Sequence, residues 1–172
     1  MLIRHATYND LEAILEIYNH IIIHTTSVYQ YKPQTPDMRK QWFEEKVKAQ
    51  LPVFVAEHER RVVGFSSLGP FRNWPAYKYT LENSIYVAEN SRGQGIGKLL
   101  MQPLIDAAIA MDIHTIIAGI DAANEGSIRF HRNFGFTEVA HFKQVGYKFG
   151  RWLDLKFMQL MLPTPASPGD DN

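Results

Sequence analysis

The feature that most constrains this chain is a cluster of glycines between a predicted strand and a predicted helix. Three of its 11 glycines fall within Arg92-Gly93-Gln94-Gly95-Ile96-Gly97-Lys98. Because glycines have no Cβ atom, successive backbone N–H groups can point into one concavity, and the N-terminus of the following helix adds partial positive charge there. The pattern predicts a site for a phosphate group. The alternative is a tight strand–helix turn without a ligand, although three alternating glycines exceed what such a turn needs.

Two common phosphate-binding motifs do not fit this turn. A dinucleotide-binding fingerprint, Gly-x-Gly-x-x-Gly, requires glycine at the position of Lys98 or, with the frame moved by two residues, of Leu100. A P-loop requires glycine at the position of Arg92 and serine or threonine at that of Leu99. What remains is the pattern Arg-x-x-Gly-x-Gly after a strand.

Hydrophobic periodicity and turn residues give the order of the elements along the chain. Helices are predicted near the N-terminus from Asn9, from Pro36, from the glycine turn to Met111, and over 127–134. Strands are predicted at the N-terminus and over 53–57, 62–68, 82–87, 114–120, 136–142 and 155–162. Because hairpin connections are mixed with helical crossovers, we expect an α/β fold of the α+β type. Its central mixed, mostly antiparallel sheet should have about seven strands, with helices on both faces.

Length and charge limit the classes of protein to consider. A chain of 172 residues suits one domain, which we place at 1–162, followed by a flexible proline-containing tail at 163–172. The 18 basic residues are balanced by 18 acidic ones, so no nucleic-acid partner is expected. No apolar run approaches the roughly 20 residues that span a bilayer, so we expect no membrane association. The first residues do not resemble a secretory signal, which favours a cytoplasmic protein.

Cysteine and histidine usage excludes further chemistry. The chain has no cysteine, which rules out disulfides, thiolate metal sites and a cysteine nucleophile. His20 and His24 have the spacing of two ligands on one helix face, but no glutamate follows His20 and no third ligand is evident. We therefore expect no metal site.

The glycine turn is followed downstream by Asn124 and by Gly135-Phe136. Together these motifs resemble those of the GCN5-related N-acetyltransferase (GNAT) superfamily, and the resemblance covers residues 2–162. Further segments resemble its phosphinothricin and methionine sulfone/sulfoximine acetyltransferases; they are 82–87, 127–131 and Lys148-Phe-Gly-Arg-Trp-Leu-Asp154. The resemblance implies a GNAT-type acyl-CoA N-acyltransferase fold and a homodimer, since the resembling enzymes are homodimers.

The resemblance also implies acetyl-CoA as co-substrate. Amides of the glycine turn would hold its pyrophosphate, and the preceding strand would pair with its pantetheine arm like an added strand. An amide near Val87 would polarise the thioester carbonyl. The implied cofactor-binding residues are Ile85, Tyr86, Val87, Arg92, Gly93, Gln94, Gly95, Ile96, Gly97, Lys98 and Asn124. Asn124 is alternatively a cap for the following helix, and both roles can hold at once.

Acetyl transfer to an amine requires a neutral amine, and an α-amino group is mostly protonated at neutral pH. Without cysteine, direct attack in a ternary complex is favoured over an acyl-enzyme. By the resemblance, Glu82 is the base, acting through water or with an elevated pKa. The alternatives are an ordinary strand-edge glutamate or a ligand for the substrate ammonium. Where the superfamily usually has a tyrosine that protonates the thiolate, this chain has His131, which is alternatively a helix surface residue while solvent supplies the proton.

An amino-acid substrate also carries a carboxylate, which the forked guanidinium of Arg72 can bind with two hydrogen bonds. In the resembling enzymes, substrate is bound at positions that correspond here to Arg72, Asn73 and Trp74, and to Glu82, Asn83 and Ser84.

The sequence therefore predicts an acetyl-CoA-dependent N-acetyltransferase for the α-amino group of a small amino acid or analogue, namely methionine sulfone, methionine sulfoximine or phosphinothricin. Two alternatives remain open. The same fold can acetylate another amine, such as a protein N-terminus or a polyamine, although around 72–84 only Glu82 is acidic. A non-catalytic acyl-CoA sensor would keep the glycine turn without the chemistry.

Overall fold

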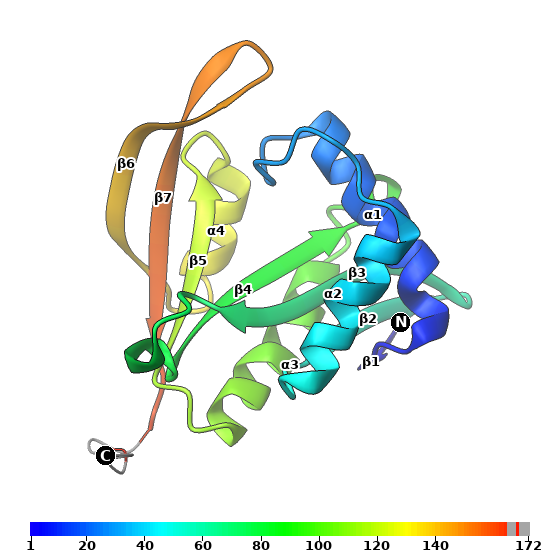
Figure 1. Ribbon diagram of the computed structural model, residues 1–172, viewed down its shortest axis with the longest axis horizontal. Coiled ribbons are helices and arrows are strands. Elements are labelled where there is room, and N and C mark those ends of the chain that lie inside the picture. The colour runs from blue at the N-terminus through cyan, green and yellow to red at the C-terminus, as the bar shows by residue number, and fades with distance from the viewer. Residues whose placement is uncertain (165–167, 169–172) are drawn as a thin grey trace.

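The computed structural model describes residues 1–164 and residue 168. Seven strands and four α-helices follow one another in the order predicted from the sequence (Figure 1). The strands are β1 (Leu2–His5), β2 (Val53–His58), β3 (Arg61–Pro70), β4 (Thr80–Val87), β5 (Thr115–Asp121), β6 (Thr137–Lys148) and β7 (Arg151–Met161). The helices are α1 (Leu11–His24), α2 (Pro36–Lys48), α3 (Ile96–Ala110) and α4 (Glu125–Arg132). The tail predicted at 163–172 lies outside the described residues except for positions 163, 164 and 168.

The seven strands form one sheet in the order β1-β2-β3-β4-β5-β7-β6. Every neighbouring pair is antiparallel except β4 and β5, which run parallel because the helical crossover through α3 connects them. The predicted mixed, mostly antiparallel sheet is confirmed.

Strands β4 and β5 pair over a short stretch and then separate. Their register is Thr80↔Thr115, Leu81↔Ile116 and Glu82↔Ile117, and it ends there. Strand β4 continues to Val87 along β3, while β5 continues along β7 (Figure 1). In the described part of the chain, residues 83–87 of β4 therefore have no strand partner on the β5 side, and the backbone edge of these residues is open.

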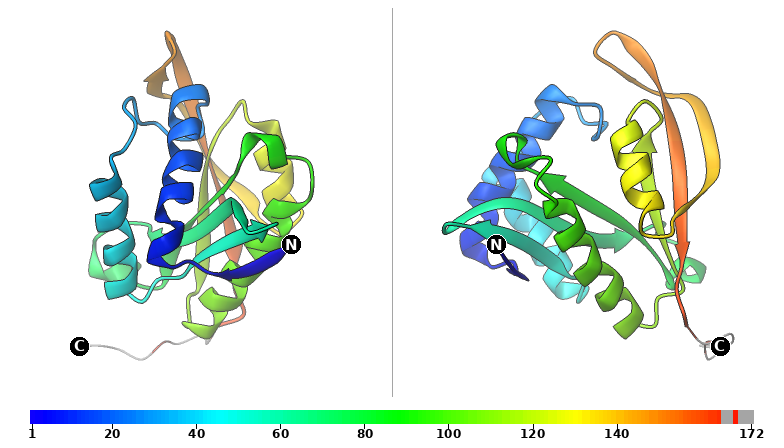
Figure 2. Two further views of the ribbon diagram at one scale, coloured as in Figure 1. Left: turned by 90° about the vertical axis from the view of Figure 1, so that its right-hand side faces the viewer. Right: turned by 180° about the vertical axis from the view of Figure 1, so that it is seen from behind.

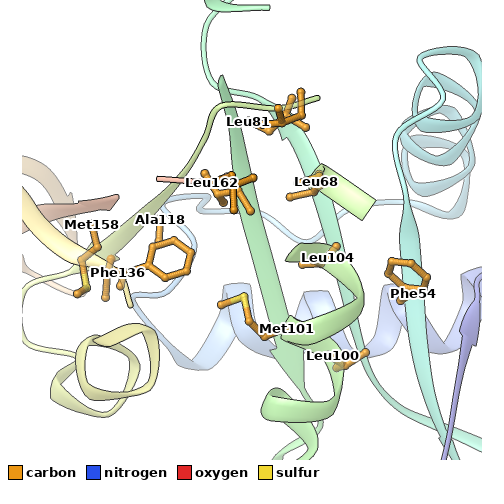
Figure 3. Packing of buried hydrophobic residues seen from close by; sticks show 14 of the residues in the cluster. Phe54, Leu68, Leu81, Leu100, Met101, Leu104, Ala118, Phe136, Met158 and Leu162 are labelled. Carbon is orange, nitrogen blue, oxygen red and sulfur yellow. The ribbon is translucent and has the colours of Figure 1, made fainter. Parts of the chain in front are cut away.

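Helices cover both faces of the sheet, as predicted (Figure 2). Helices α1 and α2 pack on one face around Phe43, Val55 and Phe65. Helix α3 and helix α4 pack on the other, where Leu100, Met101 and Leu104 of α3 lie against strand residues such as Phe54 and Leu68 (Figure 3). Truncating one of these fully buried leucines to alanine costs about 2–5 kcal/mol in comparable cores. Within the described residues, no helix combines the length and apolar character that crossing a membrane requires.

The last two strands are longer than the prediction of 136–142 and 155–162. They form a hairpin whose turn is Phe149-Gly150, both with positive φ, 51° and 73°. Most of the added residues of β6 are solvent-exposed, so they have no buried face that would mark them as part of a core strand. Pairing with β7 holds them extended, and this places Lys148 and Gly146 beside the loop between α1 and α2.

Candidate functional site

The glycine turn connects β4 to α3 and uses its glycines for two different reasons. Gly93 and Gly95 have left-handed backbones, with φ of 77° and 78°, and Gly95 is the N-cap of α3. A Cβ on either would meet no atom within 4 Å, so the turn is open on its outer side. Gly97 lies inside the helix, where a Cβ would approach the Phe130 ring at 3.3 Å. Two glycines thus shape the turn, and the third lets α3 pack on α4.

The open side of this turn presents backbone donors. In the described part of the chain, the N–H groups of residues 93–97 donate to no backbone carbonyl. The Lys98 amide, also predicted to bind phosphate, donates to the Gly95 carbonyl at 3.0 Å. Ile96 is buried and contributes only its backbone, whereas the side chains of Arg92, Gln94 and Lys98 are exposed. Five amides without a backbone acceptor at a helix N-terminus can bind an anion.

Strand β4 divides its predicted site residues between the two faces of the sheet, because alternate side chains point to opposite faces. One set contacts α4 or the α3/α4 core: Leu81, Asn83, Ile85 and Val87. The other set faces α1 and α2: Glu82, Ser84 and Tyr86. Asn83 therefore lies on the opposite face from the two residues with which it was grouped for substrate binding.

Glu82 occupies the last paired position before β4 and β5 separate, and its carboxylate borders a small hollow. The hollow has a volume of about 200 Å³ and is lined by Ser27, Tyr29, Glu82, Gly119, Asp121, Leu155 and Phe157. Of the residues predicted for the site, only Glu82 lines it. Its Oε1 atom packs over Gly119, where a Cβ would lie 3.0 Å away. Burial raises the pKa of Glu82, and the charges of Arg72 and Lys46 act against this rise.

A larger hollow, of about 380 Å³, lies where the C-terminal ends of α2 and α3 meet β1 and β2. None of the predicted site residues lines it, although Lys46 does.

The loop before β4 carries the other predicted substrate residues. Arg72, Asn73 and Trp74 are exposed, and Trp74 retains 75% of its accessible surface. The guanidinium of Arg72 stacks over the Phe71 ring at 4.9 Å, and its charge lowers the pKa of Glu82. The structure therefore brings Arg72 near Glu82, while Trp74 lies outside the hollow.

His131 is buried, 6% exposed, so the alternative of a helix surface residue is wrong. Its Nδ1 lies 2.8 Å from the Ser127 carbonyl oxygen and must donate to it, which leaves Nε2 to accept from Asn83 Nδ2 at 3.1 Å. Burial lowers the pKa of His131, so the ring is neutral at neutral pH. In this arrangement both ring nitrogens are engaged.

Asn83 and Asn124 are the predicted site residues with amide side chains near α4. The Oδ1 atom of Asn83 is buried and has no partner among the described residues. Asn124 caps α4, because its Oδ1 accepts from the Ser127 N–H at 3.0 Å. This confirms the capping interpretation of Asn124. A buried acceptor without a donor is free to accept a hydrogen bond from a bound ligand or a water.

Sequence reasoning missed the residues that build the wall opposite Glu82. Lys148 is 4% exposed, and its ammonium donates to the carbonyls of Ile22, Thr25 and Val28 at 2.6, 2.8 and 2.8 Å. Next to it, Gly146 packs against the Tyr29 ring, where a Cβ would lie 2.6 Å away. The β6–β7 hairpin thus braces the loop after α1, which carries Ser27 and Tyr29. The sequence signal that could have pointed to these residues is the Gly-x-Lys-x-Gly-x-Trp-x-Asp stretch at 146–154.

His20 and His24 do stack on one helix face, with ring centroids 4.5 Å apart, and His20 pairs with Glu89 at 3.1 Å. Across residues 1–164 and 168, no group of three or more histidine, cysteine, aspartate or glutamate side chains is arranged to hold a metal ion.

Comparisons with known proteins agree with this geometry. The chain is 43% identical over 168 residues to an L-methionine sulfoximine/L-methionine sulfone acetyltransferase of Salmonella typhimurium, with 98% of each chain covered. A crystal structure of a phosphinothricin acetyltransferase from Sinorhizobium meliloti in complex with acetyl-CoA matches with a TM-score of 0.94 and 34% identity, covering 99% of this chain and 93% of that one. A crystal structure of a ribosomal-protein-alanine N-acetyltransferase from Brucella melitensis matches with a TM-score of 0.93 and 48% identity, covering 94% and 100%.

A family model described as the Acetyltransferase (GNAT) family matches residues 11–136, which run from the start of α1 to the residue before β6 and include the glycine turn and His131. The chain belongs to the acetyltransferase (GNAT) family.

Proposed function

We propose that this chain transfers the acetyl group of acetyl-CoA to the α-amino group of a small amino acid or amino-acid analogue. Methionine sulfone, methionine sulfoximine and phosphinothricin are the proposed acceptors, since they appear in the names of its relatives. One observation carries the proposal: Glu82 stands where β4 and β5 part. On one side of it is a hollow for a small molecule, and on the other an open strand edge leads to the glycine turn.

The residues present fit acetyl-CoA. The open amides of residues 93–97 suit a pyrophosphate, and the unpaired edge of residues 83–87 suits an extended arm that carries amide groups. The unpartnered Oδ1 of Asn83 is an acceptor for an amide N–H of that arm, and Asn124 lies about two turns of helix before His131 on the same face. We assign these groups, together with Ile85, Tyr86 and Val87, to co-substrate binding.

Acetyl-CoA supplies an acetyl group activated as a thioester. Arg72 binds the carboxylate of the amino acid, which directs the amino group to Glu82. Glu82 accepts a proton from the ammonium, directly or through a water, and the neutral nitrogen then attacks the thioester carbonyl. A backbone amide near Val87 polarises that carbonyl. Because the chain has no cysteine, the nitrogen attacks directly within a ternary complex.

The leaving thiolate needs a proton at the end of the reaction. His131 is the candidate side chain, but its one N–H is held by the Ser127 carbonyl and its Nε2 by Asn83. A thiol has a pKa near 8.5, so it leaves readily as thiolate and solvent can protonate it. The geometry therefore favours solvent as donor, with His131 holding Asn83 in place.

A protein N-terminus is the second candidate acceptor, because a structure with 48% identity carries the name of a ribosomal-protein-alanine acetyltransferase. The small hollow beside Glu82 and the nearby guanidinium of Arg72 favour a free amino acid, which has a carboxylate where a protein has a peptide bond. A polyamine would instead need several carboxylates.

A homodimer and a cytoplasmic location belong to this proposal as well. The β6–β7 hairpin exposes large apolar side chains that would suit a subunit contact: Val139, Phe142, Val145, Tyr147, Phe149 and Trp152.

Release of free thiol from acetyl-CoA tests the proposed activity across a panel of amino acids, sulfones, sulfoximines, polyamines and N-terminal peptides. We expect release with methionine sulfone, methionine sulfoximine or phosphinothricin and none with polyamines. Release with peptides alone would contradict the amino-acid assignment in favour of the second candidate.

Thermal unfolding with added nucleotides, combined with the thiol-release assay, distinguishes an enzyme from a non-catalytic acyl-CoA sensor. Acetyl-CoA at 100 times its Kd should add about 2.7 kcal/mol, which raises the Tm by roughly 5–10 °C, while NADH and ATP leave it unchanged. A rise in Tm without thiol release from any amine would indicate a sensor, and equal rises with all three nucleotides would exclude a specific acetyl-CoA site.

Arg72→Ala is expected to raise the KM of the amino acid about 10-fold or more, because a bidentate charged contact of about 1.5–3 kcal/mol is lost. The KM of acetyl-CoA should stay the same. The matched control is Arg61→Ala, an exposed arginine at the other end of β3. Steady-state kinetics with each substrate varied in turn would refute carboxylate binding by Arg72 if the amino-acid KM did not change.

A further inference from the structure

Helix α2 carries a lysine whose ammonium is turned toward the sheet. Lys46 is half-buried, and its Nζ donates to the Leu68 carbonyl of β3 at 2.5 Å. It lies directly over Gly69, where a Cβ would be only 2.8 Å from Nζ. The missing side chain of Gly69 therefore makes the room that this ammonium occupies.

The strand register places this ammonium next to Glu82. Gly69 and Glu82 are directly opposite each other in the antiparallel β3–β4 pair. Opposed residues share a face of the sheet, with Cβ positions about 4.5–5.5 Å apart. Lys46 thus lies over the neighbour of Glu82, on the face that Glu82 and the hollow share.

We propose that Lys46 is a positioning residue for Glu82, whose carboxylate it keeps ionised when the amino acid is bound. The proposal rests on the proposed function only in assigning a base to the site. The expected proton acceptor is Glu82 itself, and Lys46 touches neither substrate nor acetyl group.

The other cation near Glu82 is Arg72, and its role in substrate binding explains why Lys46 is needed. Burial raises the pKa of Glu82, and Arg72 and Lys46 are the cations that act against this rise. When Arg72 binds the substrate carboxylate, the substrate neutralises that guanidinium. Lys46 then remains as the protein's own cation that favours ionised Glu82, beside the ammonium of the substrate.

The charge of Lys46 depends on its own pKa. Burial lowers its pKa to about 8, so its ammonium form predominates at neutral pH. Glu45 and Glu82 favour the charged form, and Arg39 on the same helix disfavours it. The other titratable groups facing the pair come from β1, β4, β5 and the α1–α2 loop: His5, Tyr86, Asp121 and Tyr29.

The test measures the titration of Glu82 directly, by carbon NMR of protein labelled at glutamate carboxyls and assigned by comparison with Glu82→Gln. In Lys46→Met the titration midpoint of Glu82 should rise by about one pH unit or more. The acid limb of the kcat/KM profile should move by the same amount, with full recovery of the rate at high pH. Lys46→Arg and the exposed control Lys48→Met should leave both at the wild-type position.

Gly69→Ala provides a second variant, because its Cβ displaces the ammonium without removing any charge. It should raise the Glu82 midpoint in the same direction by a smaller amount. An unchanged midpoint in Lys46→Met, or in Gly69→Ala where Lys46→Met does not fold, would overturn the proposal. The NMR measurement needs no activity, so the absence of thiol release with every amine would remove the proposed function alone.

Discussion

Glu82→Gln is expected to lower kcat/KM for the amino acid by about 10²- to 10⁴-fold at neutral pH, the range that a positioned general base contributes. Glutamine keeps the size of the side chain and fits over Gly119, but it accepts no proton. The substrate amine, mostly protonated at this pH, then has no group to deprotonate it. Binding of acetyl-CoA should be unaffected, since the glycine turn lies at the other end of β4.

The role of Glu82 as base also predicts how activity changes with pH. Burial raises the pKa of Glu82, and activity of the wild-type chain should fall as the pH drops through that raised value, because the carboxylate becomes protonated. In Glu82→Gln this fall in activity at acid pH should disappear from the pH–rate profile. Activity should instead rise at alkaline pH, where the amine loses its proton to solvent.

The measurement is a pH–rate profile of kcat/KM for both proteins. Glu59→Gln, an exposed glutamate in the β2–β3 turn, is the control and should match the wild type. If the Glu82→Gln profile has the wild-type shape, Glu82 is not the base, and its carboxylate serves at most to bind the ammonium.

Local sequence signals predicted the fold well. Element order follows from hydrophobic spacing and turn residues, and the glycine turn stands between strand and helix as expected. Thr35 and Pro36 mark the start of α2, where the Thr35 hydroxyl accepts from the Met38 N–H. Each of these features depends on residues close together in the chain, so the sequence contains the information directly.

The site was predicted less completely than the fold, and strand geometry explains one of the errors. Residues 82–84 were grouped in one substrate site, yet consecutive strand residues point to opposite faces. Asn83 accordingly meets His131 of α4, while Glu82 faces the hollow. The alternation was available from the sequence and would have separated them.

The remaining residues could not be found by local patterns. Lys46 acts on β3 and β4 through a contact 22 residues away, and Lys148 binds carbonyls more than 100 residues away. A lysine in a chain of ordinary charge is normally solvated. Only the packing of α2 on the sheet and the length of the β6–β7 hairpin turn these two ammonium groups inward.

Lys148→Met is expected to be the most destabilising change outside the apolar core. The three N–H donors of the ammonium meet three carbonyls at the end of α1 and in the loop after it, where backbone acceptors have no helical partner. Methionine fills the same space but leaves these carbonyls unsatisfied. We expect a loss of about 3–5 kcal/mol in the free energy of unfolding, which lowers the Tm by roughly 6–20 °C.

The same substitution should affect catalysis below the Tm, because the loop after α1 carries Ser27 and Tyr29 to the hollow. A loosened loop raises the KM of the amino acid and leaves the KM of acetyl-CoA unchanged. Lys143→Met, an exposed lysine on the same strand, should change stability by less than about 0.5 kcal/mol and neither KM. Equal Tm values for the two variants would show that the buried ammonium contributes nothing to the stability of the fold. A lowered Tm with unchanged kinetics would show that Lys148 stabilises the fold without affecting the substrate site.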